Sequence, residues 1–326
     1  MIFVTPKNKP MISNDIHLAA KWLKENQIVA IPTETVYGLA ANIYSDEAIK
    51  KIFETKGRPQ NNPLIVHIAS KDEVYKIASK IPEKAKILID KFWPGPLTLV
   101  LPKKETISNT ITSNKDTVAI RMPNHPVTLE LLKLLDFPLA APSANPFGSI
   151  SPTAAIHVEN YFKDKIPMTL EGGNCTKGIE STIIGFEEEK PVLYRLGSLS
   201  LEAIENEIGT IKVNNFEEKT PSAPGMMLKH YAPKTPTIIS QNINQSIIEF
   251  NNKKIGLLLF NAKNSYNTML HQEILSKNSD LNEAASNLYA AMHRLDKLEL
   301  DIIIAEQFPN NDLGRAINDR LFRATK

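Results

Sequence analysis

The chain is poor in cysteine, with Cys175 as the only one among 326 residues. A single cysteine cannot form an internal disulfide or a zinc site built from several cysteines. The sequence also places no recognised catalytic histidine beside it, which argues against a nucleophilic-cysteine enzyme. This composition fits a reducing compartment best, and we expect a cytoplasmic protein.

Other common signals are absent as well. The seven histidines include no His-x-x-x-His pair, and there is neither an EF-hand loop nor a Walker-type glycine-rich loop. The N-terminal MIFVTPKNKP is interrupted by polar residues and Pro6 too soon for a signal-peptide core or a membrane span, so we expect neither export nor a membrane partner. The net charge of +2 neither demands nor excludes nucleic acid.

What is present predicts a mixed α/β fold. A content of 42% hydrophobic and 23% charged residues suits two domains in a chain of this length. Apolar residues at helical spacing in 13–26 lead into the strand-like IVAIP of 28–32. Further predicted strands of the same sheet are 64–68, 97–101, 118–120 and 139–141, and the predicted helices between them are 46–56, 71–79, 82–92 and 126–135.

A proline-rich stretch divides this region from the rest. We predict a first domain over 1–209, a linker over 210–236 and a small α/β domain with parallel strands over 237–326. In the last, 254–260 and 301–305 are predicted strands, and 281–297 and 312–324 are predicted helices. The helical spacing of Ala284, Leu288, Ala291 and Leu295 indicates core packing rather than a cofactor site.

A Lys-Gly-Arg cluster ends one predicted helix. Lys56 and Arg58 present a point charge and a planar fork on either side of Gly57, a combination suited to a polyphosphate. The same residues could instead complement the dipole of their own helix, and the triplet alone favours that explanation.

Several polar residues of the first domain also have two explanations. Thr33 and Thr35 follow a buried strand, where α/β proteins bind ligands, but threonines also cap turns. His67 in an apolar run is by default a core histidine. Arg121 ends the strand TVAIR, where it could clamp a carboxylate through two hydrogen bonds. The residues of APSAN at 141–145 are ordinarily turn formers.

Seven segments decide between these explanations. PTETVYGL, KGRPQNNPLIVHI, FWPGPLTLVL, TVAIRMP, APSAN, ESTII and PSAPGMMLKHYAP occur in an order that resembles the threonylcarbamoyl-AMP synthase family in its two-domain form. The resemblance is strong over about residues 10 to 235 and general beyond. The family signature Lys-x-Arg and Ser-x-Asn is matched by Lys56, Arg58, Ser143 and Asn145. One departure, Asn-Cys-Thr-Lys at 174–177, precedes an intact Ser181 and affects nothing central.

The resemblance implies an N-terminal YrdC-like twisted mixed sheet with flanking helices and a small Rossmann-like C-terminal domain. It implies condensation of L-threonine, bicarbonate and ATP into threonylcarbamoyl-adenylate with release of pyrophosphate, for threonylcarbamoyladenosine in tRNA. Lys56, Arg58, Ser143 and Asn145 would surround the triphosphate and Mg²⁺, which is held mainly through the phosphates. The implied ATP contacts are Arg58, Asn62, Thr117, Ser143, Ser151, Arg195 and Tyr231, and the implied L-threonine contacts are Thr35, His67, Arg121, Ala141 and Ser181.

The segment PSAPGMMLKHYAP is more distinctive than a tether requires. Apolar and aromatic residues between fixed prolines suit a loop that folds over a ligand, so we expect a lid with Tyr231 near the phosphates. A proline-stiffened spacer is the alternative.

Two other functions remain open at this point. The first is a binder of structured RNA, since the same cations could serve RNA phosphates, and tRNA or its modification enzymes could be partners. The second is a carbamoyl-transfer module of the hydrogenase-maturation type, against which the single cysteine argues.

Overall fold

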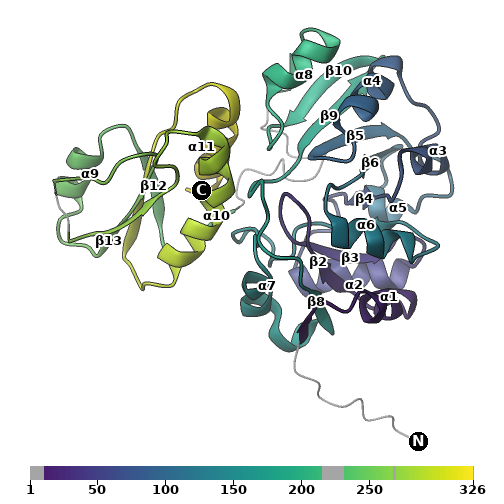
Figure 1. Ribbon diagram of the computed structural model, residues 1–326, viewed down its shortest axis with the longest axis horizontal. Coiled ribbons are helices and arrows are strands. Elements are labelled where there is room, and N and C mark those ends of the chain that lie inside the picture. The colour runs from purple at the N-terminus through teal and green to yellow at the C-terminus, as the bar shows by residue number, and fades with distance from the viewer. Residues whose placement is uncertain (1–10, 215–230, 267–268, 326) are drawn as a thin grey trace, which may run out of the picture.

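The computed structural model describes residues 11–214, 231–266 and 269–325 of the chain (Figure 1). Within these ranges it contains two sheets. The strands of the larger sheet are β1 (Met11–Ser13), β2 (Val29–Ile31), β3 (Gly38–Asn42), β4 (Ile65–His67), β5 (Leu97–Pro102), β6 (Thr117–Arg121), β7 (Leu139–Ala140), β8 (Met168–Leu170), β9 (Thr182–Glu187), β10 (Lys190–Arg195) and β11 (Lys212–Val213). Those of the smaller sheet are β12 (Thr237–Ser240), β13 (Ile255–Leu259), β14 (His271–Ile274) and β15 (Ile302–Glu306).

Helices lie against both sheets, and none of those described is long and apolar enough to cross a membrane. The first domain contains α1 (Ile16–Lys24), α2 (Asp46–Lys56), α3 (Val74–Ile77), α4 (Glu83–Phe92), α5 (Asn109–Thr112), α6 (Pro126–Lys133), α7 (Ala155–Phe162) and α8 (Leu201–Ile208), with short 3-10 turns η1 (Lys71–Glu73) and η2 (Lys163–Lys165). The second contains α9 (Ile243–Glu249), α10 (Leu281–Asp296) and α11 (Asp312–Ala324).

The pairing of the strands confirms the predicted fold class. The larger sheet has the order β1-β8-β2-β3-β7-β4-β6-β5-β9-β10-β11 and mixes parallel pairs such as β4–β6 with antiparallel pairs such as β5–β6. The smaller sheet has the order β12-β15-β13-β14 and is parallel throughout. Figure 1 shows α9 on one side of this smaller sheet and α10 and α11 on the side toward the first domain.

Helix α2 shows how local signals place a functional residue. Its first turn is capped by the Ser45 side chain, which accepts a hydrogen bond from the Ala48 amide, and it ends at Gly57 in the left-handed region with φ 61°. The bounds predicted from the sequence are therefore confirmed. The left-handed end turns the chain so that Lys56 and Arg58 are both buried.

The central strands of the larger sheet have two different faces. Val66, Leu99 and Ile120 belong to the large core formed with helices α2, α4 and α8. Their neighbours along the strands, including Ile65 and Arg121, point to the opposite face. Helices α1 and α6 cover one part of this opposite face, and the part beside β4 and β6 is available for a site.

The two domains share an apolar cluster. Val36, Ile150 and Ile179 of the first domain pack with Leu288 and many other residues of the second. The backbones approach tightly at Gly178, which has φ 69° and where an added Cβ would lie 2.3 Å from the carbonyl oxygen of Ser286 in α10. Only glycine allows the backbones to meet in this way.

Most of the predicted linker lies outside the described residues. Its first part forms β11, an edge strand parallel to β10. Residues 215–230, which include Met226, Met227 and His230 of the predicted lid, are not described, so the lid and the domain boundaries stay predictions. The description resumes at Tyr231, and Ala232 donates its amide to the carbonyl of Gly148 at 2.8 Å.

Two histidines stack across the interface. The rings of His157 in α7 and His293 in α10 lie 4.0 Å apart between centroids, with 26° between their planes. His293 donates from Nε2 to the Ser151 carbonyl at 3.2 Å, and His157 Nδ1 accepts from the Thr153 amide at 3.2 Å. Burial, together with Lys297 nearby, lowers the pKa of His293 to about 4, so both rings pack as neutral imidazoles near pH 7.

We predict that this contact makes stability depend on pH. The folded pKa of His293 lies below its unfolded value, so its contribution is complete above about pH 6.5 and declines as pH falls toward 4, by up to roughly 1.4 kcal/mol per pH unit. His293→Gln should lower Tm at pH 7 but flatten its decline between pH 6.5 and 4.5 in thermal melts. His17→Gln on the exposed face of α1 is the control. Equal slopes for wild type and His293→Gln would refute the prediction.

Candidate active site

The site is an open cavity on the face of the larger sheet opposite the core formed with α2, α4 and α8, next to the part of that face that α1 and α6 cover. β4 directs Ile65 and His67 into it, and the end of β6 contributes Arg121. Residues from the loop after β2, from APSAN and from the second half of the first domain complete the wall. The lining residues are Thr33, Thr35, Val36, Gly38, Arg58, Ile65, His67, Arg121, Ala141, Pro142, Ser143, Glu180, Ser181, Arg195 and Tyr231.

The structure brings together all five residues predicted to hold an amino acid, because Thr35, His67, Arg121, Ala141 and Ser181 all line this cavity. The Arg121 guanidinium is fixed by donating from Nη1 to Thr35 Oγ1 at 2.9 Å and from Nε to the Gly95 carbonyl at 3.2 Å. It therefore presents a rigid fork at the cavity wall.

Arg121 also has a buried acidic partner that the sequence reasoning did not identify. Glu34 places Oε2 2.7 Å from Arg121 Nη2, and both side chains are almost fully buried. A guanidinium has five N–H donors, so these contacts leave donors for a ligand. His67 stands beside this pair, and burial together with the charge of Arg121 lowers its pKa to about 3, which keeps the imidazole neutral.

Among the residues predicted to bind ATP, Arg58, Ser143, Arg195 and Tyr231 line the cavity. Arg58 donates from Nε to the Asn62 carbonyl at 3.2 Å and from Nη2 to the Pro63 carbonyl at 2.9 Å. These carbonyls hold the guanidinium in place without cancelling its charge, which suits it to bind an anion.

Lys56, Asn62, Thr117, Asn145 and Ser151 are not among the residues that line the cavity. Lys56 is buried, and its ammonium donates to the Ser143 carbonyl at 2.5 Å and to the Asn145 carbonyl. Burial and the nearby Arg58 lower the pKa of Lys56. The lysine therefore joins the end of α2 to APSAN, so in this structure it shapes the wall that carries Ser143.

Two of the remaining residues are linked to the wall through neighbours. Thr117 begins β6, two residues before Ala119, which pairs with Ile65 of the cavity. Ser151 donates from Oγ to Glu180 Oε1 at 2.6 Å, and Glu180 itself lines the cavity.

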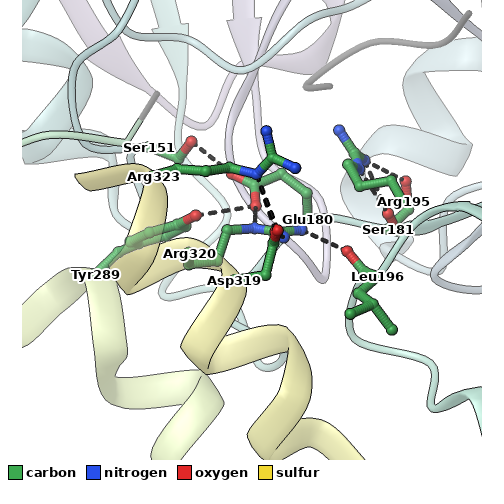
Figure 2. Close-up of polar contacts among 9 residues, drawn as sticks. All are labelled: Ser151, Glu180, Ser181, Arg195, Leu196, Tyr289, Asp319, Arg320 and Arg323. Atoms are coloured by element: carbon green, nitrogen blue, oxygen red, sulfur yellow. Dashed lines mark hydrogen bonds and ion pairs between the residues drawn. The ribbon is translucent and has the colours of Figure 1, made fainter. Parts of the chain in front are cut away.

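Glu180 is the centre of a polar cluster to which both domains contribute (Figure 2). Its Oε2 accepts hydrogen bonds from Tyr289 of α10 at 3.0 Å and from Arg320 Nε of α11 at 2.8 Å. On the first-domain side, Arg195 donates to the carbonyl of Ser181 through Nε at 3.1 Å and Nη2 at 2.8 Å. Figure 2 shows Arg320 and Tyr289 reaching Glu180 from the two helices of the second domain.

Sequence reasoning missed Glu180, Tyr289 and Arg320. One signal was available, because Arg320 continues the apolar stripe of α11 formed by Leu313, Ala316 and Ile317, where a cation is out of pattern. Its partner could not be identified, because 140 residues separate the two.

Tyr231 also lies between the domains at the cavity. Its ring stacks on Tyr289, with centroids 5.8 Å apart, and the Arg320 guanidinium lies 5.0 Å from the ring centre. Tyr231 is 1% exposed and lines the cavity. The only cysteine, Cys175, is buried, and burial raises the pKa of its thiol, which is the opposite of what a nucleophile needs.

Comparisons with known proteins cover nearly the whole chain. A family model described as telomere recombination matches residues 21–197, and one described as threonylcarbamoyl-AMP synthase, C-terminal domain, matches residues 199–325. The threonylcarbamoyl-AMP synthase of Pyrococcus abyssi is 43% identical over 324 residues, which cover 95% of this chain and 94% of the relative. That of Bacillus subtilis is 41% identical over 327 residues, covering 97% and 93%.

A solved structure agrees with this assignment. The crystal structure of P. abyssi Sua5 complexed with L-threonine matches with a TM-score of 0.89 and 42% identity, covering 95% of this chain and 94% of that chain. With both domains matched and this degree of identity over nearly the full length, the chain belongs to the threonylcarbamoyl-AMP synthase family.

Proposed function

We propose that the protein is a nucleotidyltransferase that condenses L-threonine, bicarbonate and ATP into L-threonylcarbamoyladenylate, releasing pyrophosphate and water. The product would supply threonylcarbamoyladenosine synthesis in tRNA. One observation carries the proposal: Arg121, whose remaining donors suit a carboxylate, and Arg58, which is held by backbone carbonyls and suits a phosphate, line the same cavity. The structure of a relative with L-threonine supports the choice of amino acid.

The amino acid would lie against β4 and the end of β6. The donors of Arg121 that remain beside Thr35 and Glu34 would bind the α-carboxylate. The neutral imidazole of His67 can contact the substrate without competing as a second cation. This arrangement leaves the amine free to form an N-carboxylate with carbon dioxide or bicarbonate.

The reaction then joins an oxygen of this N-carboxylate to the α-phosphorus of ATP, while the bond from that phosphorus to the bridging oxygen breaks and pyrophosphate leaves. The carboxylate is a weak nucleophile, so the protein's task is to hold the two reactants in line and stabilise charge on the phosphates. Arg58 and Arg195 are the cations at the cavity for this purpose. No covalent enzyme intermediate is required.

The residues near APSAN also fit Mg²⁺ carried by the triphosphate. Among the described residues, no cluster of three His, Cys, Asp or Glu could hold a metal. Asn145 Oδ1 is buried and accepts no hydrogen bond from any described residue, and Ser143 lines the cavity. Neutral oxygens of this kind, together with phosphate oxygens, suit Mg²⁺, which would neutralise charge on the phosphates.

We predict that Arg58→Ala and Lys56→Ala each reduce threonine-dependent pyrophosphate release by at least ~100-fold. Arg58→Ala removes a preorganised charge at the cavity, and Lys56→Ala removes the tie between α2 and the wall that carries Ser143. Lys56→Ala should also lower Tm, because it leaves two buried carbonyls without their donor. Lys50→Ala, on the exposed side of the same helix, is the control. Near-wild-type turnover of folded Arg58→Ala would overturn the phosphate assignment.

Arg121→Ala tests the carboxylate clamp. We expect the KM for threonine to rise much more than that for ATP, because the nucleotide contacts remain. The double variant Arg121→Ala/Glu34→Gln should show the same difference between the two KM values. Removing the carboxylate that Arg121 had paired with does not replace the missing guanidinium. The clamp is wrong if steady-state kinetics give equal increases in both KM values.

Substrate choice gives a third test. Serine lacks the methyl group of threonine, so kcat/KM for serine should be lower by about 10- to 200-fold, the usual effect of one methyl group in a fitted pocket. The assay is pyrophosphate release with each amino acid at saturating ATP and bicarbonate. Release that requires both threonine and bicarbonate would also exclude a plain RNA binder and a carbamoyl-transfer module, whereas equal use of the two amino acids would argue against a fitted pocket.

A further inference from the structure

The cavity that we propose binds the anionic phosphates of ATP also has a carboxylate, that of Glu180, in its wall. Glu180 lines the same cavity as Arg58 and Arg195, and its side chain is 7% exposed. Burial would raise the pKa of Glu180, but the guanidinium groups of Arg320 and Arg195 lower it to about 2, so the group is ionised at neutral pH. An ionised carboxylate beside a polyphosphate is repulsive unless a cation neutralises it.

The neutralising cation comes from the other domain. Arg320, with a side chain that is 0% exposed, pairs through Nε with Glu180 and through Nη1 with Asp319 at 2.5 Å. Its Nη2 donates to the Leu196 carbonyl of the first domain at 2.7 Å. The charges that act on Glu180 are those of Arg195 in β10 and Arg320 in α11. The neutral hydroxyls of Ser151 and Tyr289 donate hydrogen bonds to it.

The carboxylate also organises the first domain. Its Oε1 accepts from Ser151, and the backbone carbonyl of Glu180 accepts the Ser198 amide at 2.9 Å. Ser181, the next residue, shares a hydrogen bond of 2.7 Å with Thr98 Oγ1 and lines the cavity. If Glu180 lost its cation, it would turn toward the remaining cations of the cavity and compete with an incoming anion.

We propose that Arg320 of the second domain is a positioning residue that holds Glu180 against Ser151 and Tyr289 and cancels its charge, so that the cavity of the first domain accepts a polyphosphate only while the second domain is docked. The proposal rests on the proposed function for the identity of the natural ligand. The chemistry that it needs is only that of a polyphosphate anion.

The test uses the full chain and inorganic tripolyphosphate as the probe, with affinity measured by isothermal titration calorimetry. Arg320→Met should weaken binding by at least ~10-fold, because an ionised carboxylate then faces the anion at close range. Combining it with Glu180→Gln should recover most of the loss. A merely structural role for Arg320 predicts that the double variant binds no better than Arg320→Met, and that result would overturn the proposal.

The matched control is Arg315→Met. Arg315 lies on the same helix and bridges the same two domains through Glu202 of α8, away from the cavity. A loss as large as that of Arg320→Met would show that loosened domain packing explains the effect. If Arg320→Met does not fold, the single variant Glu180→Gln tests the proposal. It should bind tripolyphosphate at least as tightly as wild type, and weaker binding would refute the proposal.

Tripolyphosphate contains neither adenosine nor threonine, so the result is separate from the proposed reaction. If the wild-type protein binds tripolyphosphate more tightly than Arg320→Met, as expected, but releases no pyrophosphate from ATP, the proposed synthase reaction is refuted and this inference stands. A wild-type protein that does not bind tripolyphosphate would refute the inference itself.

Discussion

A buried carboxylate must be paired, and the pairing of Glu180 with Arg320 joins the two domains beside the cavity. Removing both charges from water costs free energy of desolvation. The ion pair offsets this cost only when each remaining lone pair and proton of the two side chains has a hydrogen-bond partner. Ser151 and Tyr289 supply those partners for Glu180, while Asp319 and the Leu196 carbonyl supply them for Arg320. Domain docking, the wall of the cavity and the position of Ser181 therefore depend on one geometry.

The cations of the site divide into two kinds according to what holds them. Arg58 donates to backbone carbonyls, which hold it in place and leave its charge to act on a ligand, while Lys56 donates to two carbonyls of APSAN and shapes the wall. Arg121 and Arg320 instead face carboxylates, so their charge is largely balanced and they contribute orientation. The division suits a site that must attract a polyanion in one part and orient an amino acid in another.

The sequence predicted much of this fold because local signals were strong. The bounds of α2 follow from Ser45 and Gly57, and the apolar runs became β4, β5 and β6. Short strands such as β1 and β8 were missed because three residues carry too little pattern, and β3 was missed because it lies within a motif that drew attention for its chemistry.

The candidate site was only partly predictable for a different reason. The motifs identified many of the residues that line the cavity, but a motif does not show which atom each side chain contacts. Lys56 was expected at the phosphates, and its partners are the carbonyls of Ser143 and Asn145, more than 80 residues away in the chain. Glu180 and Arg320 are further apart still, and such pairs depend on how whole domains pack.

The apolar cluster shared by the two domains has a consequence for any shortened form of the chain. Val36, Ile150 and Ile179 are buried because α10 and its neighbours cover them. Cut free, the first domain would present these side chains to water as one patch beside the mouth of its cavity, and contiguous patches of this kind drive self-association. The isolated first domain would then need polar substitutions at these positions to stay in solution. The second domain therefore also protects the first from aggregation.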